Sequence, residues 1–125
     1  MPKRILVVDD EEEYRLLLRR VLTGVGYDVL AAATGREGLK LYAAESPDLI
    51  LLDVMLPDML GFEFCRKIRA DPGYPGTPVL FCSVRSLVSS LAHGLRSGSA
   101  DYVIKPFVPE DLLARVRAAL RGGKP

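Results

Sequence analysis

The sequence predicts an α/β fold, a doubly wound five-stranded parallel sheet, (βα)5, in a three-layer αβα sandwich. Short aliphatic runs alternate along the chain with longer stretches whose apolar residues recur at helical spacing. The aliphatic runs are continuous, which is typical of strands buried on both faces of a parallel sheet. Right-handed helical crossovers between such strands place helices on both faces of the sheet.

The aliphatic runs predict five strands, at Ile5–Val8, Val29–Ala33, Leu49–Leu52, Val79–Cys82 and Tyr102–Ile104. The apolar positions of the five helices that follow them lie within residues 14–25, 39–42, 64–68, 88–95 and 112–120. Thr34 and Glu37 have the spacing of a capping box at the start of the second helix. Pro109 suits the first position of the last helix. The helix-ending signals are glycines, at Gly24, Gly26, Gly122 and Gly123.

The length and composition suit one domain with a sizeable core, because 49% of the 125 residues are hydrophobic. We expect this domain to span residues 1–121 and residues 122–125 to be a C-terminal tail or a truncated linker. The 17 basic and 16 acidic residues nearly cancel, so direct binding to nucleic acid is not expected.

No segment has the pattern of a secretory signal or a membrane helix. Lys3 and Arg4 precede only the short apolar run Ile5–Val8, which is too short for either. Cys65 and Cys82 lack metal-type spacing and lie in apolar segments, so we expect buried free thiols. The sequence therefore predicts a cytoplasmic protein without membrane contact.

Polar residues follow four of the five predicted strands. Asp9 and Asp10 follow the first, Asp53 the third, Ser83 the fourth and Lys105 the fifth. In open parallel sheets, ligands bind outside the carboxyl ends of the strands. Any one of these residues could simply cap a helix, but together they form a coherent set.

Three carboxylates at one edge repel each other unless cations neutralise them. Lys105 supplies one positive charge, and oxygen ligands of this kind favour Mg²⁺, with Mn²⁺ as a substitute. A carboxylate nucleophile beside a metal ion and a lysine is suited to phosphoryl transfer. The run Glu11–Glu13 is interpreted mostly as helix-start charge that the helix dipole favours, with contact of one of these carboxylates to a metal-bound water as the alternative.

At this point the residues resemble the receiver domains of response regulators, the CheY-like family, over essentially the whole chain. The motifs that carry the resemblance are Ile5–Asp10, Leu51–Pro57, Asp58–Gly61, Pro78–Ser83 and Asp101–Phe107. The resemblance implies the flavodoxin-like strand order 2-1-3-4-5, which is the order known for this family.

The resemblance also implies roles for the acidic residues. Asp53 is the phosphoacceptor. Asp10, Asp53 and the backbone carbonyl of Met55 bind Mg²⁺ directly, and Asp9 holds it through a water molecule.

The remaining roles concern the later strands. Ser83, which replaces the commoner threonine, is the switch hydroxyl that bonds the phosphoryl group. Lys105 pairs with a phosphoryl oxygen or with Asp53, and the peptide bond before Pro106 is cis. Tyr102 is the switch aromatic.

The function implied is that of a two-component phosphorylation switch rather than a classical enzyme, although the domain assists its own phosphorylation and dephosphorylation. A histidine kinase or phosphotransfer protein is the expected donor. The surface of the fourth helix, fifth strand and fifth helix would then control a downstream effector domain or protein, or form a homodimer. The sequence is equally compatible with a stand-alone relay and with one part of a larger regulator.

Three alternative functions fit the residues less well. A phosphohydrolase with an aspartyl nucleophile usually has a second Asp two residues later, where this chain has Met55. A flavodoxin-type module needs a hydroxyl- and glycine-rich loop after the first strand, where this chain has the acidic run Asp9–Glu13. A pseudo-receiver that only binds partners is disfavoured by the presence of Asp10, Asp53 and Lys105.

Overall fold

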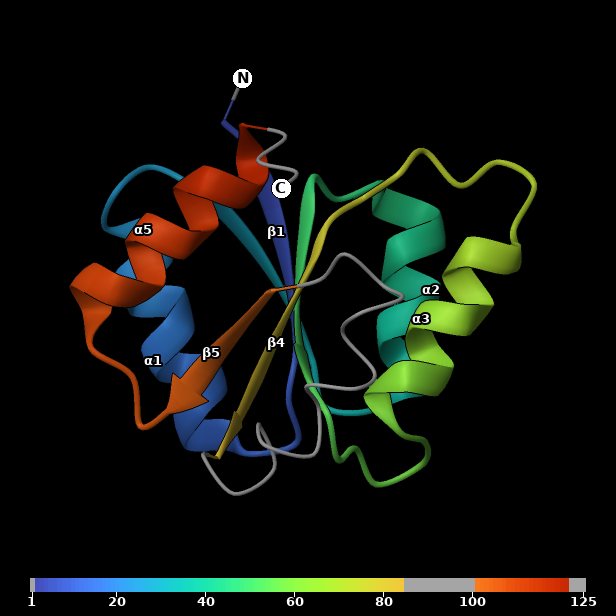
Figure 1. Cartoon of the computed structure of the whole chain (residues 1–125), viewed down its shortest axis with the longest axis horizontal. Helices are drawn as coiled ribbons and strands as arrows, with labels where there is room; N and C mark the ends of the chain where they lie inside the picture. Colours follow the sequence, from blue (N-terminus) through green and yellow to red (C-terminus); the bar gives the residue numbers. More distant parts are fainter. Residues whose placement is uncertain (1, 85–100, 122–125) are drawn as a thin grey trace.

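The computed structural model describes residues 2–84 and 101–121, which form a sheet flanked by helices (Figure 1). Its strands are β1 (Arg4–Val8), β2 (Asp28–Ala32), β3 (Leu49–Asp53), β4 (Val79–Val84) and β5 (Asp101–Lys105). Its helices are α1 (Glu12–Thr23), α2 (Gly35–Glu45), α3 (Gly61–Ala70) and α5 (Pro109–Leu120). The helix predicted around residues 88–95 and the terminal glycines Gly122 and Gly123 lie outside the described residues.

All strand pairs in the sheet are parallel, and the strand order is β2-β1-β3-β4-β5. This confirms the predicted fold class and order. Helices α1 and α5 cover one face of the sheet, and α2 and α3 cover the other (Figure 1). The result is the three-layer arrangement predicted from the continuous aliphatic runs.

Each face of the sheet has its own hydrophobic core, because successive strand residues point to opposite faces. Leu6 and Val8 of β1 pack toward Phe64 of α3 in one core. Ile5 and Val7 pack with Leu18, Leu22, Leu112 and Val116 of the other helix layer. All four of these β1 side chains are fully buried, which explains why this strand contains no polar alternation.

The helix starts follow the predicted signals with one difference. The Thr34 hydroxyl accepts a hydrogen bond from Glu37 N at 3.1 Å, so Thr34 caps α2 as expected. The Glu37 carboxylate, however, accepts from Ala33 N at 2.8 Å, so the return bond of the capping box reaches one residue further back. Pro109 is the first residue of α5, as predicted.

The predicted strand boundaries hold to within about two residues, the usual uncertainty of strand ends. Helix α1 ends at Thr23, with Gly24 as its C-cap, and Gly26 takes a positive φ of 99° in the turn that follows. Cys65 and Cys82 are buried free thiols, as predicted. Within the described residues, no helix is long and apolar enough to cross a membrane.

The packing between α2 and the sheet predicts a clear effect for Gly38→Ala. A Cβ atom at this helical position would lie 2.8 Å from Cγ2 of Val8 and 3.0 Å from Cε2 of Phe64, both fully buried. Overpacking should outweigh the gain in helix propensity and lower the free energy of unfolding by about 1–3 kcal/mol in urea denaturation.

The control is Gly73→Ala, where the nearest atom would be Oδ1 of Asp71 at 3.8 Å. This change should shift the free energy of unfolding by less than about 0.5 kcal/mol. A Gly38→Ala protein as stable as the parent would contradict the close packing of α2 on β1.

Candidate functional site

The predicted polar residues meet at the carboxyl edge of the sheet because the strands run parallel. Asp53 and Lys105 are the last residues of β3 and β5, and Asp9 directly follows β1. Ser83 is the penultimate residue of β4, which continues to Val84 rather than ending at Cys82. The strand register thus places side chains from four segments of the chain at one edge.

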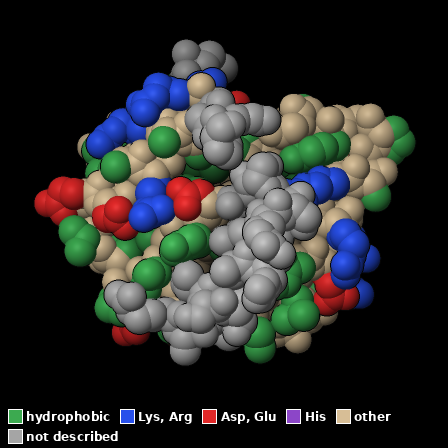
Figure 2. Space-filling model, in the orientation of Figure 1, with side chains coloured by type: hydrophobic (Ala, Val, Ile, Leu, Met, Phe, Trp, Pro, Cys, Tyr) green, Lys and Arg blue, Asp and Glu red, His purple; other side chains and the backbone are tan. Residues whose placement is uncertain are grey.

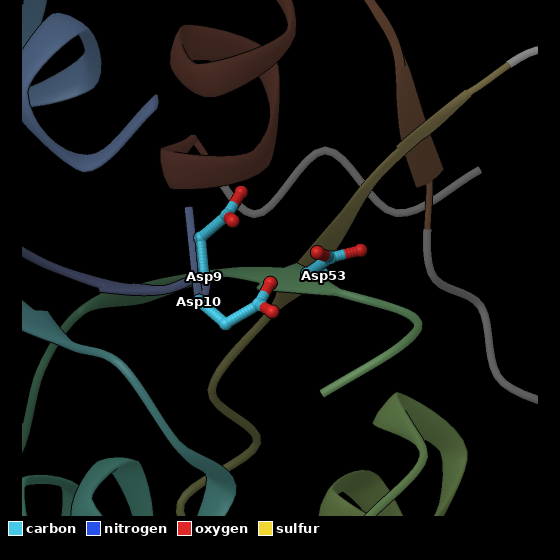
Figure 3. Close-up of side chains that lie close together, drawn as sticks. All are labelled: Asp9, Asp10 and Asp53. Atoms are coloured by element: carbon cyan, nitrogen blue, oxygen red, sulfur yellow. The ribbon is translucent and has the colours of Figure 1, made fainter. Parts of the chain in front are cut away.

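The carboxylates of Asp9, Asp10 and Asp53 form an acidic cluster, with oxygen atoms within 4.8 Å of one another (Figure 3). Asp9 and Asp53 are buried and Asp10 is exposed. Burial raises the pKa of Asp53 above its usual value, and the charges of Asp9 and Asp10 raise it further. Lys105 and a hydrogen bond from Met55 N oppose this shift.

Lys105 is the cation that compensates this cluster. Its Nζ lies 2.8 Å from Oδ2 of Asp9, 3.1 Å from Oε1 of Glu11 and 3.5 Å from Oδ2 of Asp53. Burial alone lowers the pKa of Lys105, but the neighbouring carboxylates outweigh it and raise the pKa above its usual value. Lys105 is therefore charged at neutral pH, and its shortest contact is with Asp9 rather than with Asp53.

Two hydrogen bonds between side chains and the backbone fix the segment that carries Asp9. Oδ1 of Asp9 accepts a hydrogen bond from Glu11 N at 2.9 Å, and the guanidinium of Arg15 donates to the Asp9 carbonyl at 2.8 Å. These bonds turn the chain from β1 into α1. They leave Oδ2 of Asp9 directed at Lys105.

Hydrogen bonds hold the loop between β3 and α3 both where its two ends meet and at Asp58 within it. Gly61 N donates to the Val54 carbonyl at 2.7 Å, and a Cβ at Gly61 would lie 2.8 Å from the Asp53 carbonyl oxygen, so the close approach requires glycine. At the other side of the loop, the Asp58 carboxylate accepts from Gly35 N and Arg36 N at 2.8 and 2.9 Å. These two hydrogen bonds lower the pKa of Asp58, which supplies negative charge to the start of α2.

The remaining predicted residues lie around the cluster. Ser83 is buried, and its Oγ has no hydrogen-bond partner among the described residues. The side chain of Met55 is exposed, and its backbone N lies 3.3 Å from Oδ1 of Asp53. Tyr102 is half-buried against the core, with the guanidinium of Arg115 5.6 Å from its ring. The peptide bond between Lys105 and Pro106 is cis.

Two residues that contact Lys105 were missed by sequence reasoning. The sequence indicates helix-start charge, or contact with a metal-bound water, for Glu11, and part of an apolar helix face for Tyr14. The Tyr14 ring in fact lies 4.3 Å from Nζ of Lys105 and packs beside Phe107. Both contacts join segments about ninety residues apart, and no local pattern signals them.

Comparison with known proteins identifies the family. The profile of the response regulator receiver domain matches residues 5–117. The chain belongs to this family. It is 47% identical over 125 residues to the response regulator MprA of Mycolicibacterium vanbaalenii, and covers 53% of that protein. It is 44% identical over 121 residues to the DNA-binding response regulator MtrA of Mycolicibacterium smegmatis, and covers 52% of that protein.

Solved structures agree with this assignment to the receiver domains. A CheY-like receiver domain protein from Methanospirillum hungatei matches 98% of this chain and 96% of its own, with a TM-score of 0.85 and 33% identity. The Vibrio cholerae chemotaxis protein CheY4 matches 94% of this chain and 98% of its own, with the same TM-score and identity. The chain spans about half the length of the curated relatives named above. It is thus a receiver domain of the two-component response regulator type, a family that generally does not consist of classical enzymes.

Receiver domains generally bind Mg²⁺, and the donor set of this chain fits that ion. The acidic cluster offers carboxylate oxygens, which hard cations prefer. Its three negative charges, together with that of Glu11, exceed the one positive charge of Lys105. A divalent cation would offset this excess.

Burial of the Asp53 carboxylate, together with the like charges beside it, predicts that Asp53→Asn stabilises the metal-free receiver domain. Because folding raises the pKa of Asp53, its ionised form destabilises the fold at neutral pH. The variant should melt a few degrees higher than the parent at pH 7 in the presence of a chelator. The difference should shrink on acidification, because a protonated Asp53 carries no charge.

Asp28→Asn, a change at an exposed carboxyl on β2, is the control and should show no comparable rise. Adding Mg²⁺ should stabilise the parent more than the Asp53→Asn protein. A lower melting temperature for Asp53→Asn in chelator would contradict the electrostatic picture of the cluster.

Proposed function

We propose that this receiver domain accepts a phosphoryl group on Asp53 and passes the resulting change to an output partner. The observation that carries the proposal is the position of Asp53, buried at the end of β3 with its carboxylate beside those of Asp9 and Asp10 and 3.5 Å from Nζ of Lys105. The chemistry of this set suits a phosphoacceptor, because a carboxylate nucleophile faces a cation that can balance charge on transferring oxygens.

The donor is a phosphohistidine of a histidine kinase or phosphotransfer protein. An oxygen of the ionised Asp53 attacks phosphorus, so a P–O bond forms as the P–N bond breaks. The electron pair of the broken bond stays on the imidazole nitrogen, which then takes up a proton. Lys105 reaches Asp53 at 3.5 Å and would contact an oxygen of the new phosphoryl group.

The residues that would hold Mg²⁺ are Asp10, Asp53 and the Met55 carbonyl directly, and Asp9 through a water molecule, with Mn²⁺ as a substitute. When bound, the ion neutralises charge on the phosphoryl oxygens. The loop contacts of Gly61 and Asp58 support the segment that carries Met55. The pairing of Asp9 with Lys105 orients its carboxylate beside the cluster.

The switch begins at Ser83, whose buried hydroxyl has no partner among the described residues and would bond the new phosphoryl group. Movement of Ser83 makes room for Tyr102 to turn toward the core. Side chains of both charges lie on the surface formed by β5 and α5 (Figure 2). Arg115 of α5 pairs there with Asp101 and Asp111. This surface would bind an effector domain or protein, or a second copy of the chain.

The proposed setting is a cytoplasmic relay. Buried free thiols are compatible with that reducing compartment. The MtrA relative is named a DNA-binding response regulator, and a DNA-binding effector is the proposed type of output here. The receiver unit itself would be residues 1–121.

Phosphorylation is directly testable by mass spectrometry. Acetyl phosphate with Mg²⁺ should add the mass of one phosphoryl group to the parent protein, and a chelator should prevent this. Asp53→Asn should abolish the addition, because an amide is not a nucleophile of comparable strength. Asp28→Asn should be phosphorylated like the parent, and phosphate retained by Asp53→Asn would contradict the assignment.

Ser83→Ala should separate phosphorylation from switching. Because the Ser83 hydroxyl has no partner to lose among the described residues, the free energy of unfolding should change by less than about 1 kcal/mol. The variant should still be phosphorylated, but the accompanying change in the Tyr102 NMR signals should be largely lost. Ser83→Thr keeps the hydroxyl and should restore it; a full Tyr102 response in Ser83→Ala would rule out this role.

A further inference from the structure

The contact between Glu11 and Lys105 has no role in the function proposed above. Oε1 of Glu11 lies 3.1 Å from Nζ of Lys105, closer than Oδ2 of Asp53 at 3.5 Å. The lysine side chain is only 5% exposed, whereas that of Glu11 is 57% exposed. Glu11 therefore reaches from the surface to a buried ammonium group at the proposed phosphorylation site.

The position of Glu11 in the chain indicates that this contact does not serve the helix. Glu11 is the N-cap residue of α1, where a side chain commonly bonds the free backbone N–H groups of the first turn. Its side chain makes no such bond. The carboxylate instead pairs with a residue 94 positions later.

An ammonium group has three donors, and three carboxylates surround the one on Lys105. Asp9 is held in place by the backbone and buried beside Lys105. A phosphoryl group on Asp53 would replace the single negative charge of the carboxylate with about two, and would bring its oxygens toward the same ammonium. Because Glu11 is the exposed carboxylate of the three, it is the one that must move away from Lys105.

We propose that Glu11 is a positioning residue that holds Lys105 toward the β1 side of the site and thereby weakens binding of a phosphoryl group at Asp53. The inference rests on the phosphoacceptor function proposed above. Glu11 competes with the phosphoryl oxygens for Lys105 and repels them as a like charge. It limits how far the equilibrium can shift to the phosphorylated form.

The test compares Glu11→Gln with Glu12→Gln in the full chain. Both changes remove one negative charge at the start of α1, but Lys105 is paired only with Asp9, Glu11 and Asp53 among the described residues. Glu11→Gln should bind beryllofluoride, a phosphoryl mimic, about three- to tenfold more tightly than the parent in the presence of Mg²⁺. Glu12→Gln should bind it much as the parent does.

A second readout needs no metal ion. In protein labelled with ¹⁵N-lysine, the ammonium signal of Lys105 should move in Glu11→Gln and stay in place in Glu12→Gln. An unmoved signal, or equal beryllofluoride affinity in the two variants, would overturn the role of Glu11. A parent protein that bound no beryllofluoride and took no phosphate from acetyl phosphate would instead overturn the proposed function itself.

Discussion

The site depends on one buried cation. Lys105 is 6% exposed and lies within ion-pair distance of carboxylates from the turn after β1 and from β3. Without it, two buried acidic groups would face each other with no compensating charge, which a folded interior tolerates poorly. The ammonium group of Lys105 thus links side chains that follow or end different strands. The carboxylates of Asp9, Glu11 and Asp53 share its positive charge.

The backbone around the ion pairs of Lys105 limits how far the loop after β3 and the strands can move. Gly61 allows α3 to start against the Asp53 carbonyl, and Asp58 attaches the same loop to the start of α2. The two faces of the sheet are filled by separate cores, which leave little freedom for β1 and β3. The strand ends are therefore fixed, whereas Glu11 is the exposed carboxylate among the three that pair with Lys105. Such a site can change state by moving a few side chains.

Much of this arrangement could be predicted from the sequence. Continuous aliphatic runs such as Leu49–Leu52 predicted the buried parallel strands, and parallel strands predicted that Asp9, Asp53 and Lys105 would share an edge. Strand order came from the family resemblance, because aliphatic runs do not encode which strands are neighbours. The pairing of Glu11 with Lys105 was not predictable, since Glu11 in the acidic run Asp9–Glu13 looks like ordinary helix-start charge.

The buried thiols have a practical consequence for studying the domain in solution. Burial raises the pKa of Cys65 to about 11 and that of Cys82 to about 12, so neither forms appreciable thiolate near neutral pH. Maleimides and thiol-reactive nitroxides are electrophiles that the thiolate attacks, so the reaction needs an accessible thiolate. A single cysteine introduced on the surface should therefore take a probe selectively in an otherwise native background, so that conformational exchange can be followed by fluorescence or electron resonance.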